Sequence, residues 1–273
     1  MTDIHELATR FHRLHDGPHA LRLANCWDAG SAAVIARAGA DAVATTSAGV
    51  AWSLGVADGD RLDRAAAVDA VARITRSVSV PVTADIESGY GETPDDVAET
   101  VRLFLTAGVV GVNIEDAHEG GLRDVTAQAE RIAAARQAAA DAGVDLFVNA
   151  RIDNFLGGIG EPEGRTAVAL ERAARYLAAG ASGIFVPGVA DLAVVRELAD
   201  GIDAPLNVMA GGGAPPVPEL ETAGARRVSV GPGITLAAYA LAGRAATELF
   251  ETGGYTSLTD GLGFAEVNAM WSR

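Results

Sequence analysis

The stretch Val78-Ser-Val-Pro-Val-Thr-Ala-Asp-Ile-Glu-Ser-Gly-Tyr-Gly91 decides the fold of this chain. Its first half is an apolar run that leads into two carboxylates, Asp85 and Glu87, and then into a turn with two glycines. Side chains alternate along a strand, so we expect both carboxylates on one side of it, about 6–7 Å apart. Like charges this close need a cation, a proton or a donor. The stretch is either the start of an oxygen-rich metal site or an acidic turn in solvent.

The composition limits which classes of protein this chain can belong to. The chain has 273 residues, of which 49% are hydrophobic, so it can bury a sizeable core. Its formal charge is −15 and its pI is near 4.7. Nucleic-acid phosphates require a basic surface, so this balance argues against a nucleic-acid partner.

The sequence contains no lysine, and all 21 basic residues are arginine. A Schiff-base aldolase and a pyridoxal-phosphate enzyme both need a lysine amine, so both classes are excluded. A Walker phosphate-binding loop is excluded for the same reason. The single cysteine, Cys26, leaves no internal disulfide and no multi-cysteine metal site, and we expect it to be a small buried hydrophobe.

The ends and the hydropathy indicate a cytoplasmic protein. Residues 1–16 are polar with a helical pattern and lack a basic-then-apolar signal segment. No run of 18 or more apolar residues is present, so we expect no membrane association.

One sequence pattern recurs along the chain: a helical stretch rich in Ala and Arg, then Ala-Gly or a close variant, then a short β-branched run. Glycine after a helix is a left-handed C-cap, and short apolar strands alternating with helices predict βα units and a parallel sheet. The predicted strands are 21–26, 41–46, 80–86, 109–115, 145–151, 182–187, 204–209 and 226–230. The predicted helices are 28–38, 60–77, 94–107, 125–142, 163–179, 190–199, 215–223 and 233–251.

Eight such units without a linker predict an α/β fold of the (β/α)8 TIM-barrel type, with residues 1–273 forming a single domain. An N-terminal helix within 1–18 precedes the barrel, and a helical tail at 252–273 follows it. A doubly wound sheet is the alternative, but no predicted strand is followed by a dinucleotide glycine fingerprint.

In a barrel the functional site lies at the carboxyl ends of the strands. Polar residues gather at these predicted ends, on an otherwise apolar scaffold. They are Asn25, Asp28, Thr45, Ser47, Asp85, Glu87, Asn113, Glu115, Asp116, Asn149, Arg151, Asp153 and Asn207.

With these residues in place, the chain resembles the isocitrate lyase/phosphoenolpyruvate mutase superfamily over most of its length. The motifs that carry the resemblance occur in the family's order. They are Asn25-Cys-Trp-Asp-Ala-Gly-Ser31, Thr46-Ser47, Leu54-Gly-Val-Ala-Asp58, Ala84-Asp-Ile-Glu-Ser-Gly-Tyr-Gly91, Val112-Asn-Ile-Glu-Asp116, Asn149-Ala-Arg-Ile-Asp153 and Pro205-Leu-Asn207.

The resemblance implies a barrel whose eighth helix is swapped between subunits of a dimer or tetramer. It also implies Mg²⁺, or Mn²⁺, as the cofactor. Asp85 would bind the metal directly, and Asp58, Glu87 and Glu115 would bind it partly through water.

The resemblance further places the substrate. Ser47 and the backbone amides near Ala48 and Gly49 would take the substrate carboxylate. Arg151 would bind substrate oxygens or stabilise developing charge. Asp85 and Asn207 are also expected among the substrate contacts.

The chemistry is coherent on physical grounds. A 2-oxo acid chelates Mg²⁺ through its carbonyl and carboxylate oxygens, and the metal acts as a Lewis acid that stabilises an enolate when the bond at C3 breaks. Arginine is the planar, permanently charged partner for a carboxylate or phosphonate. The expected substrate is therefore a small 2-oxo or 2-hydroxy acid.

The chain departs from the lyases of this superfamily in one loop and at Ala210. The lyases carry a Lys-Lys/Arg-Cys-Gly-His signature with a catalytic cysteine, whereas this chain has Ala117-His-Glu-Gly-Gly-Leu-Arg123. The glycines favour a flexible lid. His118, Glu119 or Arg123 could replace the missing acid/base, and we assign catalytic candidacy to His118, with Glu115 and Arg151. Ala210 stands where the lyases have a Glu, which weakens isocitrate or methylisocitrate cleavage as the reaction.

We therefore expect a Mg²⁺-dependent lyase that cleaves the C–C bond at C3. The alternatives are P–C chemistry on phosphonopyruvate or phosphoenolpyruvate, as a mutase or a hydrolase, and a non-catalytic 2-oxo-acid binder that has lost the lid residues.

Overall fold

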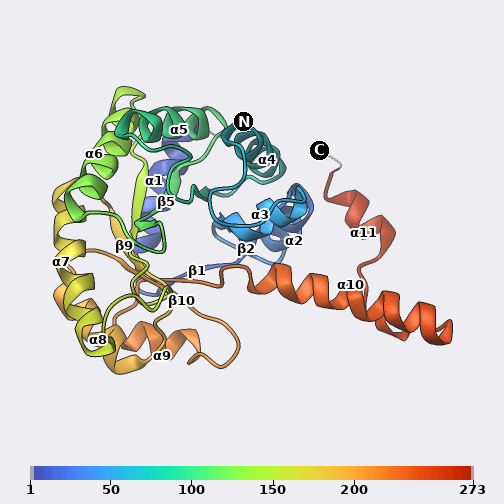
Figure 1. Cartoon of the computed structure of the whole chain (residues 1–273). Coiled ribbons are helices and arrows are strands. Elements are labelled where there is room, and N and C mark those ends of the chain that lie inside the picture. Colours follow the sequence, from blue (N-terminus) through green and yellow to red (C-terminus); the bar gives the residue numbers. More distant parts are fainter. Residues whose placement is uncertain (1–2, 272–273) are drawn as a thin grey trace.

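A computed structural model describes residues 3–271, and it is a barrel of parallel strands surrounded by helices (Figure 1). The sheet order is β1-β11-β10-β9-β8-β5-β4-β3-β2, and every neighbouring pair in it is parallel. β1 and β2 are two parts of one stretch, interrupted only at Ala24, so the first strand pairs with β11 on one side and with β3 on the other. The predicted (β/α)8 barrel is confirmed.

The strands lie within two residues of the predicted ranges, because the apolar runs that predicted them are the buried ones. They are β1 (Leu21–Leu23), β2 (Asn25–Cys26), β3 (Val43–Thr45), β4 (Val82–Asp85), β5 (Gly111–Glu115), β8 (Phe147–Arg151), β9 (Gly183–Val186), β10 (Leu206–Met209) and β11 (Arg227–Ser229).

The helices form the outer layer, and several begin at capping residues visible in the sequence. Asp28 and Ser31 form a capping box at α2, and Thr93 and Asp96 form another at α5. The helices are α1 (Ile4–His15), α2 (Ala29–Arg37), α3 (Ser47–Ser53), α4 (Arg64–Ser77), α5 (Pro94–Thr106), α6 (Val125–Asp141), α7 (Arg165–Ala178), α8 (Leu192–Gly201), α9 (Val217–Thr222), α10 (Gly233–Thr252) and α11 (Phe264–Ala269). Two 3-10 turns, Pro162–Gly164 and Thr256–Leu258, complete the set.

Two features were not predicted. The helix α3 lies directly after β3, where seven residues, four of them buried, show no clear helical period. The hairpin of β6 (Ala117–His118) and β7 (Gly121–Leu122) occupies the loop that the glycines marked as flexible.

Helix α4 begins later than predicted, at Arg64, because the Asp63 carboxylate caps it.

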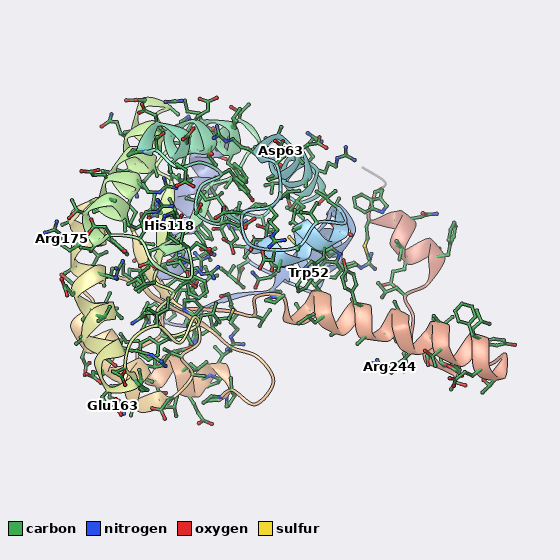
Figure 2. All side chains as sticks on the ribbon, in the orientation of Figure 1. Trp52, Asp63, His118, Glu163, Arg175 and Arg244 are labelled. Atoms are coloured by element: carbon green, nitrogen blue, oxygen red, sulfur yellow. The ribbon has the colours of Figure 1, made fainter. Side chains whose placement is uncertain are left out.

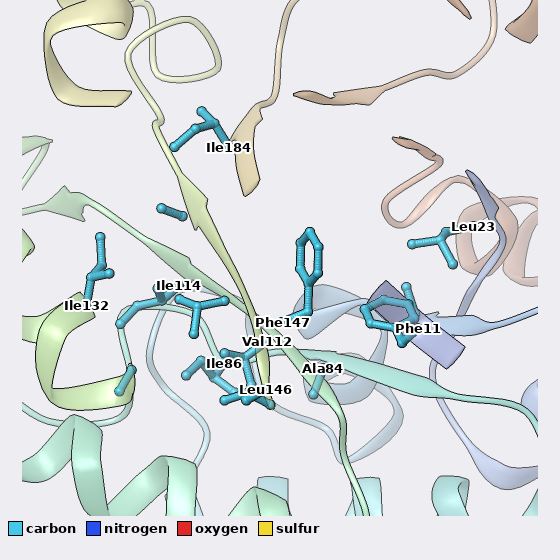
Figure 3. Close-up of a cluster of buried hydrophobic side chains, with 14 of the residues drawn as sticks. Phe11, Leu23, Ala84, Ile86, Val112, Ile114, Ile132, Leu146, Phe147 and Ile184 are labelled. Atoms are coloured by element: carbon cyan, nitrogen blue, oxygen red, sulfur yellow. The ribbon is translucent and has the colours of Figure 1, made fainter. Parts of the chain in front are cut away.

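Helix α1 closes the amino-terminal end of the barrel. Phe11 is fully buried and packs edge-on against Phe147, with 5.6 Å between ring centroids (Figure 3). His15 stacks on the same Phe147 ring at 3.9 Å. Burial lowers the pKa of His15 to about 3, so this histidine is a neutral member of the core.

The middle of the barrel is polar, unlike the usual branched aliphatic filling. The Asn149 Nδ2 donates to the Oδ1 atoms of Asn113 and Asn207, at 2.9 and 3.1 Å. The guanidinium of Arg227, which is 1% exposed, donates to the same Asn113 oxygen at 3.1 Å. This buried layer lies below the strand ends.

Helix α10 and the tail project away from the barrel (Figure 1). Within α10 the buried residue is Thr235, whereas Leu236, Phe250 and other large apolar side chains are exposed. Within residues 3–271 no helix is long and apolar enough to cross a membrane.

Candidate active site

Three charged residues meet at the carboxyl end of the barrel because each is the last residue of its strand. Asp85 ends β4, Glu115 ends β5 and Arg151 ends β8, and these strands are neighbours in the sheet. Glu115 and Arg151 are register partners. The predicted meeting of polar strand ends therefore occurs for these three residues.

The Arg151 guanidinium is held by three carboxylates. Its Nη1 lies 2.8 Å from Glu115 Oε2 and 3.6 Å from Asp85 Oδ2. Its Nε and Nη2 donate to Asp153 Oδ1 at 3.0 and 2.8 Å. The carbon of the guanidinium lies 5.9 Å from the centre of the Phe185 ring below it. Arg151 is thus fixed in orientation at the centre of the rim.

Asp85 is positioned by two neighbouring elements. Its Oδ2 accepts a hydrogen bond from Ser47 Oγ at 3.2 Å, and its backbone N–H donates to Thr45 Oγ1 at 3.0 Å. Its Oδ1 accepts the backbone N–H of Glu87 at 3.2 Å. These contacts join the end of β4 to the start of α3.

Glu87 does not continue the strand. β4 ends at Asp85, and Glu87 has the left-handed φ of +50°, so the alternation that placed both carboxylates on one side does not extend to it. Its carboxylate accepts the backbone N–H of Asp60 instead. The strained turn therefore ties the loop before α4 to the rim.

The acidic rim is desolvated. Burial raises the pKa of Asp85 and of Glu115, although the Arg151 charge acts in the opposite direction on both. Burial alone would lower the pKa of Arg151, but Glu115, Asp153 and Asp85 raise it overall. The rim is thus a cluster of carboxylates that a single arginine cation contacts.

Glu87 gives a prediction for stability against pH. Burial raises its pKa to about 7, with the charges of Asp60 and Asp85 acting in the same direction. A raised acid pKa favours the folded state below the ordinary value of 4.5, and this advantage is lost as the pH rises towards 7. In metal-free protein Glu87→Gln should match the wild type at pH 4.5. It should be more stable above pH 7, by up to about 3 kcal/mol.

Urea unfolding at pH 4.5, 6 and 8 measures this difference. Glu99→Gln is the control, because the Glu99 side chain is exposed on α5 and pairs with Arg102 along the same helix. A constant difference between Glu87→Gln and wild type across the pH range would contradict the prediction.

The predicted carboxylate-binding segment forms the first turn of α3. Ser47 Oγ donates to Asp85, and the next two residues of the turn, Ala48 and Gly49, are buried. A side chain at Gly49 would clash with Thr235 and Trp27, so only glycine lets the start of α10 pack here. Their substrate role stays a prediction.

Other predicted residues lie elsewhere in the fold. Asp58 is exposed on the loop before α4, and its charge acts on Asp85 and Glu87. Asn207 lies in the buried polar layer, where its amide bonds Asn149 and Ser229. Asp28 caps α2. The metal-binding role of Asp58 and the substrate contact of Asn207 stay predictions.

The loop at 117–123 is a two-stranded hairpin. Ala117 pairs with Leu122 and His118 with Gly121, leaving Glu119 and Gly120 as the turn, both with positive φ. In Figure 2 His118 lies inside the outer helical layer, whereas Arg175 lies at its edge.

Arg123 sets the protonation pattern of His118. The Arg123 Nη2 lies 3.0 Å from His118 Nδ1 and can only donate, so Nδ1 accepts and the neutral ring carries its proton on Nε2. In this arrangement His118 offers its Nε2–H as a hydrogen-bond donor. Its catalytic role stays a prediction.

The carboxylates fit a divalent cation by charge and by ligand type. Asp85, Glu87, Glu115 and Asp153 are buried or nearly so, and one guanidinium does not balance them. Within residues 3–271, however, no three Asp, Glu, His or Cys side chains converge as a metal site. Arg151 Nη1 lies 3.6 Å from Asp85 Oδ2 and 2.8 Å from Glu115 Oε2, so the guanidinium supplies the positive charge at these two carboxylates.

Some residues that matter here were not singled out. Tyr176 and Arg172 on α7 bind the Asp116 carboxylate, and Asp60 binds Glu87. α7 gave only an amphipathic pattern, so no local signal marks Tyr176 or Arg172 as neighbours of the rim.

Comparison with known proteins agrees with this geometry. A family model described as phosphoenolpyruvate phosphomutase matches residues 11–250. An uncharacterised protein of Mycobacterium tuberculosis H37Rv is 37% identical over 226 residues, 81% of each chain. The 2-methylisocitrate lyase of Escherichia coli K12 is 33% identical over 68% of this chain and 64% of its own. A crystal structure from Burkholderia cenocepacia J2315, provisionally assigned as a phosphonomutase, is 45% identical, with a TM-score of 0.86, over 89% of this chain and 99% of its own.

A parallel barrel with charged residues gathered at the carboxyl ends of its strands is the architecture of a TIM-barrel enzyme. The chain belongs to the phosphoenolpyruvate phosphomutase family, within the isocitrate lyase/phosphoenolpyruvate mutase superfamily. Lyases and mutases both belong to this superfamily, so membership supports an enzyme.

Proposed function

We propose that the protein is a Mg²⁺-dependent lyase that cleaves the C–C bond at C3 of a small 2-oxo or 2-hydroxy acid. The observation that carries the proposal is the Arg151 guanidinium clasped by Asp85, Glu115 and Asp153 at the strand ends. This arrangement places a guanidinium of fixed orientation, which can bind an anion, beside more carboxylate oxygens than its single charge balances. Relatives named 2-methylisocitrate lyase and 2,3-dimethylmalate lyase support C–C cleavage.

In this proposal Asp85 holds the metal directly, with Asp58, Glu87 and Glu115 completing the set partly through water. Mg²⁺ would supply Lewis-acid stabilisation of the negative charge that develops on the substrate. Mn²⁺ is the alternative cation. Because burial already raises the pKa of Asp85 and Glu115, a cation would relieve the cost of their ionisation.

The chain's own groups orient the acid. Ser47 Oγ and the amides near Ala48 and Gly49 receive the carboxylate, and Arg151 donates to oxygens on which charge develops. The hairpin at 117–123 covers the site and excludes water. His118 donates from Nε2 rather than acting as a base, given the hydrogen bond at its Nδ1.

P–C chemistry on phosphonopyruvate is the second candidate. It is favoured by the family model and by the Burkholderia structure, which the chain covers over 99% of its length. A planar guanidinium suits a phosphonate as well as a carboxylate, so the rim itself does not separate the two reactions.

The test is a panel of oxaloacetate, 2,3-dimethylmalate and phosphonopyruvate, each with Mg²⁺ and with EDTA, followed by phosphorus and proton NMR. Metal-dependent cleavage of a C–C bond supports the lyase, and conversion of phosphonopyruvate alone favours the second candidate. Metal-dependent binding by calorimetry without product indicates a non-catalytic binder. If the protein neither turns over nor binds any of these acids, the proposal is wrong.

A second copy of the chain is the proposed partner, with α10 swapped in a dimer or tetramer. Large apolar side chains of α10 and the tail are exposed, Phe250 by 82% and Phe264 by 83%. A groove of about 760 Å³ remains beside β1, lined by Leu21, Ile35 and Ile234 among others. Large apolar side chains exposed together on α10 and the tail indicate a protein interface.

We expect Phe250→Asp to shift the assembly towards monomer in sedimentation velocity, because a buried charge opposes association. Glu251→Gln is the control on the same helix turn. An unchanged sedimentation coefficient for Phe250→Asp, in a wild type that is itself oligomeric, would contradict the swap.

A further inference from the structure

Asp116 is a fully buried carboxylate that joins three parts of the fold. Its Oδ1 accepts the backbone N–H of Asp153 at 2.9 Å. Its Oδ2 accepts Tyr176 OH at 2.8 Å and Arg172 Nη1 at 3.0 Å. Both oxygens are thus occupied, one by the rim and the other by helix α7.

On the rim side, Asp116 supports the residue that orients Arg151. The position of the loop at Asp153 depends on the hydrogen bond that the Asp153 backbone N–H donates to the Asp116 carboxylate. The Asp153 carboxylate in turn takes two of the Arg151 N–H groups and leaves Nη1 for Glu115 and Asp85. The Asp116 backbone N–H also donates to the Arg151 carbonyl at 3.2 Å.

On the hairpin side, Asp116 and its partner Arg172 hold Arg123. The Arg123 backbone N–H donates to the Asp116 carbonyl at 2.7 Å. The Arg172 Nη1 that binds Asp116 also donates to the Arg123 carbonyl at 2.9 Å. Arg123 then donates to His118 in the hairpin. One short chain of hydrogen bonds therefore runs from the hairpin to Arg151.

We propose that Asp116 is a positioning residue that, with Arg172 and Tyr176, couples the 117–123 hairpin to the orientation of Arg151. Asp116 does not face the substrate and acts through Asp153. A shift of the hairpin pulls on Arg172 and Asp116, and this changes where Arg151 is held. The inference rests on the proposed function for its effect on turnover, but the coupling itself is a property of the fold.

The test compares Arg172→Met with Arg136→Met. Arg136 is a matched control, because its guanidinium also holds three acceptors, Gly180 O, Leu146 O and Ser182 Oγ, but on the amino-terminal side of the barrel. The readouts are amide hydrogen exchange of the 117–123 segment and of Asp153, together with kcat and KM. Tyr176→Phe is a milder second variant that keeps the ring and the buried charge pair.

We expect Arg172→Met to speed exchange both in 117–123 and at the Asp153 amide. It should lower kcat by about 10²-fold with a smaller change in KM, as for a misplaced catalytic group. Tyr176→Phe should lower kcat by about tenfold, the value of one hydrogen bond to a charged group. Arg136→Met should lower the melting temperature without either change.

Faster exchange confined to 117–123, with the Asp153 amide unchanged, would overturn the coupling. Equal losses of kcat in Arg172→Met and Arg136→Met would overturn it as well, since a general loss of stability would then explain both. If the wild type turns over none of the tested acids, the proposed function fails. The exchange at Asp153 still decides the coupling in that case.

Discussion

Asp85→Asn is expected to abolish metal-dependent ligand binding and turnover while the protein stays folded. Asparagine keeps the shape, its Oδ1 can still accept the backbone N–H of Glu87, and its Nδ2 can donate to Ser47 Oγ, but it removes the charge that a divalent cation requires. The loss in metal affinity should exceed the 10–100-fold that supporting residues around a metal typically cost.

Stability should move in the opposite direction. Burial raises the pKa of Asp85, so a neutral side chain removes an unfavourable buried charge, and the free energy of unfolding without metal should be equal to or above that of wild type. Calorimetric titration with Mn²⁺ and urea unfolding measure the two effects. Asp69→Asn is the control, because Asp69 is exposed on α4 and pairs with Arg73 on the same helix. Unchanged Mn²⁺ and ligand affinity in Asp85→Asn would remove Asp85 from the metal site.

Arg151→Met should weaken binding of the acid by about 10²- to 10³-fold, the usual cost of truncating one partner of a buried, hydrogen-bonded charge pair. It leaves Asp85, Glu115 and Asp153 without their cation. The free energy of unfolding should therefore also fall, by about 3–5 kcal/mol. Arg151→Lys keeps the charge but loses the planar fork, so it should recover stability more than binding.

Arg123→Met is the comparison, because Arg123 bonds His118 and Glu92 and is not in contact with Asp85. It should disturb the hairpin and lower binding by less than Arg151→Met does. Calorimetry with oxaloacetate, in the presence of Mg²⁺, measures both affinities. Equal losses in the two variants would show that the anion site lies under the hairpin rather than at Arg151.

The strands and most helices could be read from local chemistry. Val82, Thr83 and Ala84 of β4 are buried on both faces of the sheet, and the largely apolar sequence that this requires is visible without any neighbour. Capping pairs such as Thr93 and Asp96 likewise act within one turn. Short elements such as α3 were missed, because seven residues with four consecutive buried positions carry no helical period.

The residues of the site also fall into two groups, those that could be placed from local sequence and those that could not. Asp85, Glu115 and Arg151 could be placed together because each ends a strand of a parallel barrel, and parallel strands bring their ends to one edge. Glu87 could not be oriented, because its left-handed φ and its bond to Asp60 depend on a loop 27 residues away. The hairpin was likewise marked only by its glycines.

The sequence by itself thus determined the barrel, the acidic rim and the central arginine, since strand burial and strand ends follow from local patterns. Only the tertiary structure decided how that arginine is held. The bonds from Asp116 to Asp153, Tyr176 and Arg172 join residues up to 60 positions apart. Long-range contacts of this kind leave no periodic trace in the chain, because they exist only once the strands and helices have packed.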